Sequence, residues 1–186
     1  MATLGTVPED DQPCVALSAV DEVVLEQLVL AATTDAAADE VTPPLTEGPG
    51  WTATRVTWLR SFHRARRAGL DGPAREATWA IAVDNRVVGS VRLKHTDEQG
   101  ILETGLWLTR GARGRGVGRA AMVAVLQQAA GAGAAVVLAE TTVANASALA
   151  VLQHLGFDTA PTEDGRGVRA FLALGTTKPS SAQGPA

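Results

Sequence analysis

The chain has 186 residues, a formal net charge of −4, 46% hydrophobic residues and one cysteine. Its length and apolar content predict a folded protein with a substantial core and exclude a chain that is disordered throughout. One cysteine excludes an internal disulfide bond, no apolar run reaches the roughly 18 residues of a membrane span, and the acidic start lacks a signal-peptide pattern. These features favour a cytoplasmic protein that does not act in a membrane.

The order of the expected elements indicates the fold class. Hydrophobic periodicity predicts strands at 15–18, 78–83, 87–95, 101–108, 134–143, 157–160 and 168–174. It predicts helices at 20–33, 51–68, 117–130 and from Asn145 to Gly156. Residues 13–174 would form a single domain, between a flexible lead at 1–12 and a disordered tail at 175–186. Strands and helices do not alternate strictly, so we expect an α/β (α+β) fold with a central, mostly antiparallel sheet flanked by helices.

A glycine-rich loop, RGARGRGVGRAAM at 110–122, connects an expected strand to an expected helix. The first N–H groups of a helix lack intrahelical acceptors and lie at the positive end of its dipole, so this position suits a phosphate. The loop is not a P-loop, because Arg119 and Ala120 stand where Lys and Ser/Thr are needed, and it lacks the last glycine of the dinucleotide fingerprint. It matches R-x-x-G-x-G through Arg113, Gly116 and Gly118, although a flexible arginine-rich loop is the plain alternative.

Two motifs together resemble one enzyme family. The first is GLWLTRGARGRGVGRAAM at 105–122, and the second is VANASALAVLQHLGF at 143–157, which begins with an asparagine and ends in Gly-Phe. Over roughly residues 78–160 the chain is similar to the GNAT superfamily of acetyl-CoA-dependent N-acetyltransferases. Within it, the chain looks most like ribosomal-protein N-acetyltransferases and kasugamycin-type aminoglycoside 2′-N-acetyltransferases. The resemblance implies a splayed sheet and acetyl-CoA as the acetyl donor.

The resemblance also implies the cofactor-binding residues. Loop amides would hold the pyrophosphate of acetyl-CoA, and the edge of the preceding strand would pair with its pantetheine arm. The N–H of Leu108 would stabilise the oxyanion, and Asn145 would bond the cofactor amides or only cap its helix. The full set is Leu106, Trp107, Leu108, Arg113, Gly114, Arg115, Gly116, Val117, Gly118, Arg119 and Asn145.

The expected chemistry is direct attack by a primary amine on acetyl-CoA in a ternary complex. The amine is protonated near pH 7, so a base must take a proton. Glu103 and Glu140 lie on the strands that would flank the splay and are the candidate bases, unless they are surface residues at strand ends. The chain has no tyrosine, whereas many family members use one as acid for the thiolate. Ser147 is the nearest hydroxyl in the motif, and the thiolate can also leave unprotonated.

The acceptor is inferred from the charge of the N-terminal part. Residues 1–50 contain ten of the twenty acidic residues and none of the sixteen basic ones. Asp39, Glu40, Glu47 and Trp51 would suit a polycationic amine, so an aminoglycoside antibiotic is the expected acceptor, with resistance or self-protection as the role. A solvated acidic face explains the same charge equally well.

Other interpretations stay open. The N-terminus of a ribosomal protein is the main rival acceptor, and a non-catalytic acetyl-CoA sensor is the alternative of another class. The two glutamates argue against the sensor. Basic residues at 55–67 could bind nucleic acid, but the chain is acidic overall, so we expect no nucleic-acid partner. We also expect no metal, and a homodimer stays open.

Overall fold

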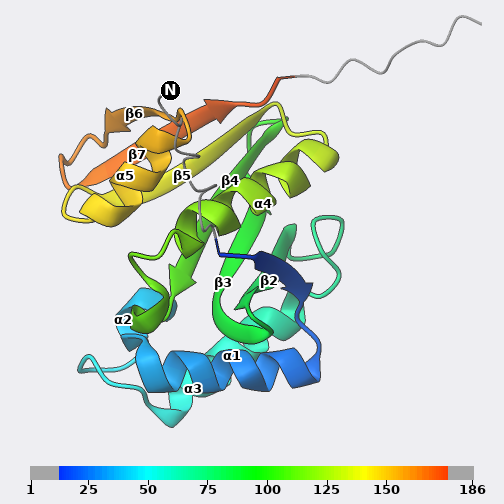
Figure 1. The fold of residues 1–186 in the computed structure, drawn as a ribbon, viewed down its shortest axis with the longest axis vertical. Coiled ribbons are helices and arrows are strands. Elements are labelled where there is room, and N and C mark those ends of the chain that lie inside the picture. Colours follow the sequence, from blue (N-terminus) through cyan, green and yellow to red (C-terminus); the bar gives the residue numbers. More distant parts are fainter. Residues whose placement is uncertain (1–12, 176–186) are drawn as a thin grey trace, which may run out of the picture.

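The structure, a computed structural model, describes residues 13–175, which form a seven-stranded sheet with helices on both faces (Figure 1). All neighbouring strands are antiparallel except β4 and β5. The predicted fold class is confirmed. The lead predicted at 1–12 and residues 176–186 of the predicted tail lie outside the described residues. Across the sheet the strands are β1 (Val15–Ala19), β2 (Glu76–Val83), β3 (Arg86–His95), β4 (Ile101–Leu108), β5 (Val136–Thr142), β7 (Gly167–Ala173) and β6 (Asp158–Pro161).

Short local signals fix where the helices begin. Asp21, Thr52 and Asn145 each accept a backbone hydrogen bond as N-caps, which satisfies an N–H that would otherwise lack a partner. Gly116 begins the helix after the glycine-rich loop with a left-handed backbone, at φ 78°, that glycine adopts without strain. The helices are α1 (Glu22–Asp35), α2 (Ala38–Val41), α3 (Ala53–Ala65), the 3-10 turn η1 (Arg110–Ala112), α4 (Val117–Gly131) and α5 (Ala146–His154). The sequence does not predict α2 and η1, because each is too short to show a period.

Two apolar clusters hold the helices against the sheet. α4 and α5 pack on one face, around Val91, Val125 and Val137. α1 and α3 pack on the other face, around Leu28 and Leu59, and Trp107 reaches this second cluster from β4. Among residues 13–175, no helix combines the length and hydrophobicity needed to cross a membrane.

The sheet splits between β4 and β5. These two strands pair in parallel only from Ile101 to Thr104, opposite 136–139. Beyond that point β4 stays paired with β3 as far as Leu108, and β5 stays paired with β7 as far as Thr142. The two halves therefore diverge in the middle of the sheet, which confirms the expected splay and exposes one backbone edge of each strand.

Gly89 allows β3 to approach the diverging end of β4. A Cβ at Gly89 would lie 2.2 Å from the Trp107 carbonyl oxygen and 2.8 Å from Leu108 Cδ2. Because the first neighbour is backbone, Gly89→Ala should lower the free energy of unfolding by about 3 kcal/mol, as expected for overpacking. Chemical denaturation measures this change.

The matched control is Gly131→Ala at the last residue of α4, where a Cβ would meet nothing within 4 Å. This variant should be no less stable than the parent, since alanine favours helix over glycine. Equal stability of Gly89→Ala and the parent would contradict the close approach of β3 and β4.

Candidate active site

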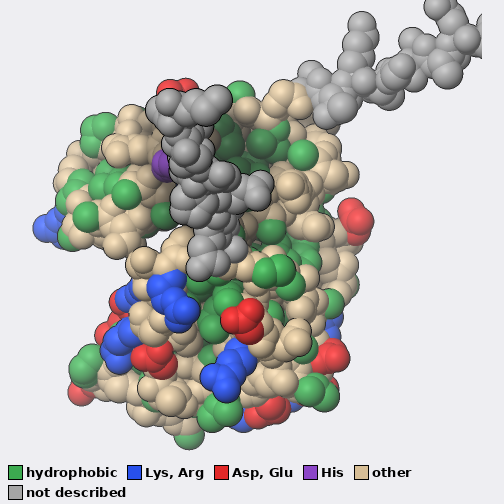
Figure 2. All heavy atoms as spheres, viewed as in Figure 1, with side chains coloured by type: hydrophobic (Ala, Val, Ile, Leu, Met, Phe, Trp, Pro, Cys, Tyr) green, Lys and Arg blue, Asp and Glu red, His purple; other side chains and the backbone are tan. Residues whose placement is uncertain are grey.

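A cleft of about 890 Å³ lies at the split between β4 and β5. Figure 2 shows it as a hollow between the lobe of α5 and β5–β7 and the rest of the molecule. The cleft brings together most of the residues predicted to bind the cofactor. Arg115 and Val117 are the exceptions: Arg115 is exposed, and Val117 is buried in the core. The predicted residues that line it are Leu106, Trp107, Leu108, Arg113, Gly114, Gly116, Gly118, Arg119, Glu140, Asn145 and Ser147, together with Glu40.

The edge of β4 in this cleft carries backbone groups that face away from β3. Thr109 N–H donates to Val88 O at 2.8 Å, so the neighbouring pair, Leu108 with Gly89, is the non-hydrogen-bonded kind. The N–H groups of Leu108 and Leu106 therefore point toward the side from which β5 has diverged. An extended ligand can add there as a strand would.

The glycine-rich loop is held by its own arginine. The Arg113 guanidinium donates to the Leu108 carbonyl oxygen from Nε at 3.1 Å and from Nη2 at 2.9 Å. It also forms an ion pair with Glu40 on α2, and these hydrogen bonds hold the pKa of the Glu40 carboxyl below its usual value. Gly111 N–H donates to Asp35 at 2.8 Å. The Arg113 side chain is therefore engaged in holding the loop to β4 and α2.

Asn145 and Glu140 stand on the opposite wall. Asn145 Oδ1 accepts from Ala148 N–H at 3.1 Å, so the residue caps α5 while it also lines the cleft. Glu140 is exposed and forms an ion pair with Arg169 on β7 at 2.8 Å. Ser147, the second residue of α5, lines the same cleft.

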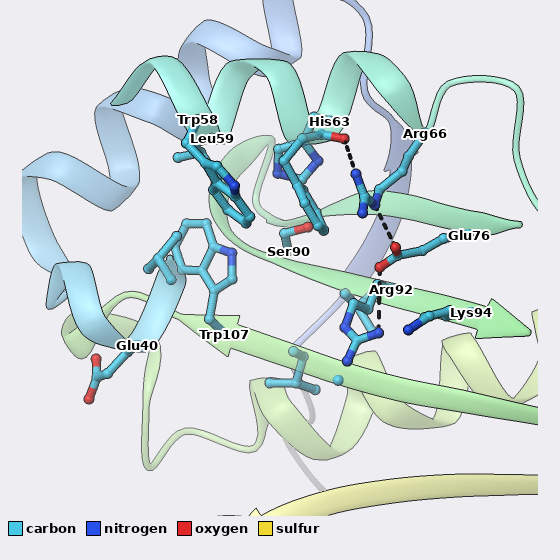
Figure 3. A pocket seen from close by; sticks show the side chains of 15 residues that line it. Glu40, Trp58, Leu59, His63, Arg66, Glu76, Ser90, Arg92, Lys94 and Trp107 are labelled. Carbon is cyan, nitrogen blue, oxygen red and sulfur yellow. Dashed lines mark hydrogen bonds and ion pairs between the residues drawn. The ribbon is translucent and has the colours of Figure 1, made fainter. Parts of the chain in front are cut away.

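Glu103, which does not line the cleft, belongs to a network of charges whose members Arg66, Glu76 and Arg92 are shown in Figure 3. It forms an ion pair with Arg92 of β3. Arg92 also contacts Glu76 at 3.4 Å, and Glu76 in turn binds Arg66 at 2.6 Å. The Glu76 side chain is only 4% exposed, so its two arginine partners compensate a charge that would otherwise be costly to bury.

A second cavity, of about 430 Å³, lies between α3 and the strands β3 and β4. Trp58, Phe62 and Trp107 line it, and Figure 3 shows Trp58 and Trp107 at one end and the charged network at the other. Most residues of this cavity are not predicted from the sequence. Strand alternation would have placed Ser90, Arg92 and Lys94 on one face, but nothing in the sequence shows which helix faces them.

The two cavities meet at one short segment of β4. Gly105, Leu106 and Trp107 line both of them, as does Glu40. This segment lies where the sheet opens, so it separates the cleft beside α4 and α5 from the pocket on the α3 side.

Three of the four residues predicted to bind the acceptor line neither cavity. Asp39 forms an ion pair with Arg55 at 2.7 Å, and the Arg55 side chain is buried. The Trp51 indole N–H donates to Ala36 O at 3.0 Å, and the ring packs against the α1–α3 core. Glu47 is exposed in the loop before α3. Only Glu40 reaches the cavities, so these residues do not come together as the expected acidic mouth.

His63 is a buried neutral histidine beneath the second cavity. It is 1% exposed, and its Nδ1 lies 3.0 Å from Thr78 Oγ1. Burial, with a smaller contribution from the positive charges of Arg66 and Arg67, lowers the pKa of His63 to about 4.

This lowered pKa predicts how stability changes in acid. Between about pH 6.5 and pH 4 the unfolded chain binds a proton at His63 that the folded chain does not, so the free energy of unfolding falls as pH falls through that range. The full loss is about 3 kcal/mol, at roughly 1.4 kcal/mol per pKa unit. His63→Gln should remove this part of the slope. Denaturant titrations of both proteins from pH 8 to pH 4 test it, and parallel pH profiles would contradict it.

Comparison with known proteins agrees with the geometry. Residues 46–157 match the model of the acetyltransferase (GNAT) family. The fold is similar to the GNAT domain of S. lividans PAT, with 19% identity, a TM-score of 0.65 and coverage of 86% of this chain and 89% of that one. It is also similar to the microcin C7 self-immunity acetyltransferase MccE in complex with acetyl-CoA and AMP, at 16% identity and TM-score 0.64, covering 89% and 94% of the two chains. No curated protein sequence matches significantly.

A third similar structure is the ribosomal L7/L12 α-N-protein acetyltransferase RimL in complex with coenzyme A, at 16% identity and TM-score 0.64, covering 87% and 95% of the two chains. The chain belongs to the GNAT acetyltransferase family. It is an acetyl-CoA-dependent acetyltransferase, so the predicted enzyme class and cofactor are confirmed at the level of the family.

Proposed function

We propose that this enzyme transfers the acetyl group of acetyl-CoA to a primary amine in a ternary complex, with the two substrates entering from opposite faces of the sheet. The observation that carries the proposal is that Gly105, Leu106 and Trp107 line both cavities. A donor along the open edge of β4 and an amine in the α3-side pocket would meet across this segment.

The cleft residues fit acetyl-CoA. The open β4 edge offers the N–H groups of Leu106 and Leu108 to an extended arm. Gly114 and Gly116 both have positive φ, at 70° and 78°, so the loop backbone turns without side chains that would block a pyrophosphate at the start of α4. Bound acetyl-CoA supplies the thioester carbonyl that the amine attacks. Leu108 N–H would donate to the carbonyl oxygen as negative charge develops on it.

Glu103 is the better candidate for the base. Alternation along β4 places it on the face of Trp107, toward α3, and its partner Arg92 lines the α3-side pocket. A carboxylate oxygen of Glu103 would accept the ammonium proton, directly or through water. Glu140 lines the cofactor cleft instead, exposed and paired with Arg169.

Residues of α5 decide which group could hydrogen-bond the thiolate of coenzyme A as it leaves. Leu152, where a tyrosine would stand, is buried in the core. Ser147 lines the cleft and would be the hydroxyl that hydrogen-bonds the leaving sulfur. A thiol pKa near 8.5 also lets the thiolate leave with little assistance.

The similar structures do not identify the acceptor. MccE is named a self-immunity acetyltransferase, and RimL acts on a ribosomal protein. The aminoglycoside expected from the sequence loses its main support, because Asp39 is paired with Arg55 and Asp39, Glu47 and Trp51 all lie outside both cavities. A peptide N-terminus remains the rival acceptor.

An acetyl-CoA thiol-release assay tests the proposal, with amino acids, polyamines, aminoglycosides and peptides with free N-termini as acceptors. We expect acceptor-dependent release that requires a primary amine and proceeds by sequential rather than ping-pong kinetics. Tight acetyl-CoA binding without release for any amine would support the sensor instead. Ping-pong kinetics would exclude direct attack.

A further inference from the structure

We infer that the acceptor is a small amine that also carries an anionic group, such as a carboxylate, close to the amine, together with an apolar side group. This inference rests on the proposed function. It concerns only what the α3-side pocket selects.

The charged end of the pocket holds more positive than negative charge. Its cations are Arg66, Arg92 and Lys94, and its carboxylate is Glu76; Glu103 lines neither cavity but is paired with Arg92. The other carboxylate in the lining, Glu40, is paired with Arg113. Each oxygen of Glu76 is taken by a different arginine, and Arg92 also binds Glu103. The two arginines and the two glutamates therefore balance one another and leave Lys94 in excess.

Lys94 stands between the two carboxylate-bearing strands. Its neighbours in register are Glu76 on β2 and Glu103 on β4, and its side chain lines the pocket. Within residues 13–175 its ammonium group comes within ion-pair distance of no carboxylate. A polycationic acceptor would meet this excess of positive charge, whereas a carboxylate would neutralise it.

Arg92 brings a cation to the segment that both cavities share. A Cβ at Gly105 would lie 3.4 Å from Arg92 Nε and 3.7 Å from Nη2, so the guanidinium lies over β4 where Gly105 has no side chain. A carboxylate bound near Arg92 and Lys94 would hold the amine of the same molecule beside Glu103. One face of the pocket thus fits both groups of an amino-acid-like acceptor.

The other end of the pocket is aromatic. Trp58 and Phe62 stack with their ring centroids 4.9 Å apart, and Trp107 faces Trp58 from β4 (Figure 3). The guanidinium of Arg66 lies 3.6 Å from the centre of the Phe62 ring and links the aromatic end to the charged network. These rings suit the apolar side group of the acceptor.

Matched acceptor pairs test the inference in the thiol-release assay. L-Leucine, L-methionine and L-phenylalanine are each compared with the corresponding amide, which keeps the amine and side group and removes the negative charge. An amide has the more acidic ammonium, so at pH 7.5 more of it is already free amine, and amine basicity cannot explain a preference for the acid. We expect kcat/KM for the acid to exceed that for the amide by about tenfold or more, the scale of one charge-assisted hydrogen bond.

Variants at Lys94 assign that preference to the pocket. Lys94→Gln should bring the ratio of kcat/KM for the acid to kcat/KM for the amide toward one, mainly by raising KM for the acid. Lys94→Arg should retain most of the preference for the acid. Arg86→Gln, at the far end of β3, is the matched control and should leave the ratio unchanged.

The inference is overturned, while the proposed function stands, if amides are acetylated as well as acids or if only an aminoglycoside or a peptide N-terminus is acetylated efficiently. The inference is also overturned if the Lys94→Gln variant has the same acid-to-amide ratio of kcat/KM as the parent. Absence of release with every amine removes the proposed function, and the inference falls with it.

Discussion

Replacing Gly116 with aspartate should abolish acetyl-CoA binding, with Kd rising by at least about 100-fold in calorimetry. The residue begins α4 with φ 78° and lines the cofactor cleft. A carboxylate there would face the pyrophosphate, and two like charges about 4 Å apart near a protein surface repel by roughly 4 kcal/mol. Aspartate also tolerates a left-handed backbone and caps helices well, so the fold should survive the change.

Two control variants separate charge from backbone strain. Gly116→Asn has nearly the same shape without the charge, so it should weaken binding far less than the aspartate. Gly165→Asp places the same residue at another position with positive φ, 66°, in the β6–β7 turn, and should leave acetyl-CoA binding unchanged. If Gly116→Asp binds acetyl-CoA as the parent does, the pyrophosphate does not lie at the start of α4.

The second large effect is expected at Glu103. Glu103→Gln keeps the shape of the side chain and its hydrogen-bonding reach but removes the proton acceptor. Turnover should fall by about 100-fold, while the Kd for acetyl-CoA stays the same. Because free amine increases with pH and needs no base, the deficit should shrink as pH rises from 7 toward 10.

Glu140→Gln is the matched comparison, since Glu140 lies on the other strand of the splay and is paired with Arg169. It should retain turnover within about threefold, the range expected when no proton transfer is lost. A pH-independent deficit in Glu103→Gln would show that Glu103 positions Arg92 rather than accepts the proton. Loss of turnover in Glu140→Gln alone would transfer the role of base to that residue.

Much of the fold and of the cofactor site could be predicted from the sequence, because the signals are local. Asp21, Thr52 and Asn145 mark helix starts through side chains that bond the backbone three residues later. The glycine-rich loop, the strand before it and the start of α5 all lie between Ile101 and Ala146. Contiguous segments of this kind keep their motif wherever they are placed in the fold.

The α3-side pocket could not be predicted in this way. It combines side chains of α2, α3, β2, β3 and β4, and which helix covers which strands is decided by packing rather than by local propensity. Four acidic residues of the N-terminal part, Glu22, Glu26, Asp39 and Glu40, form ion pairs with arginines. Some of these partners are distant in the sequence: Arg113 is 73 positions from Glu40, and Arg64 is 42 positions from Glu22.

The sequence by itself therefore determined the fold class, the glycine-rich loop expected to bind phosphate and the two candidate glutamates, since each depends on periodicity or on spacing within one segment. The tertiary structure decided which charges remain for a ligand. A count along the chain treats Asp39, Glu40 and Glu47 as one acidic patch, whereas folding pairs two of them with arginines and leaves the third in an exposed loop. Charge available to a ligand is a property of the folded arrangement, because an ion pair cancels most of the field of each partner at a distance.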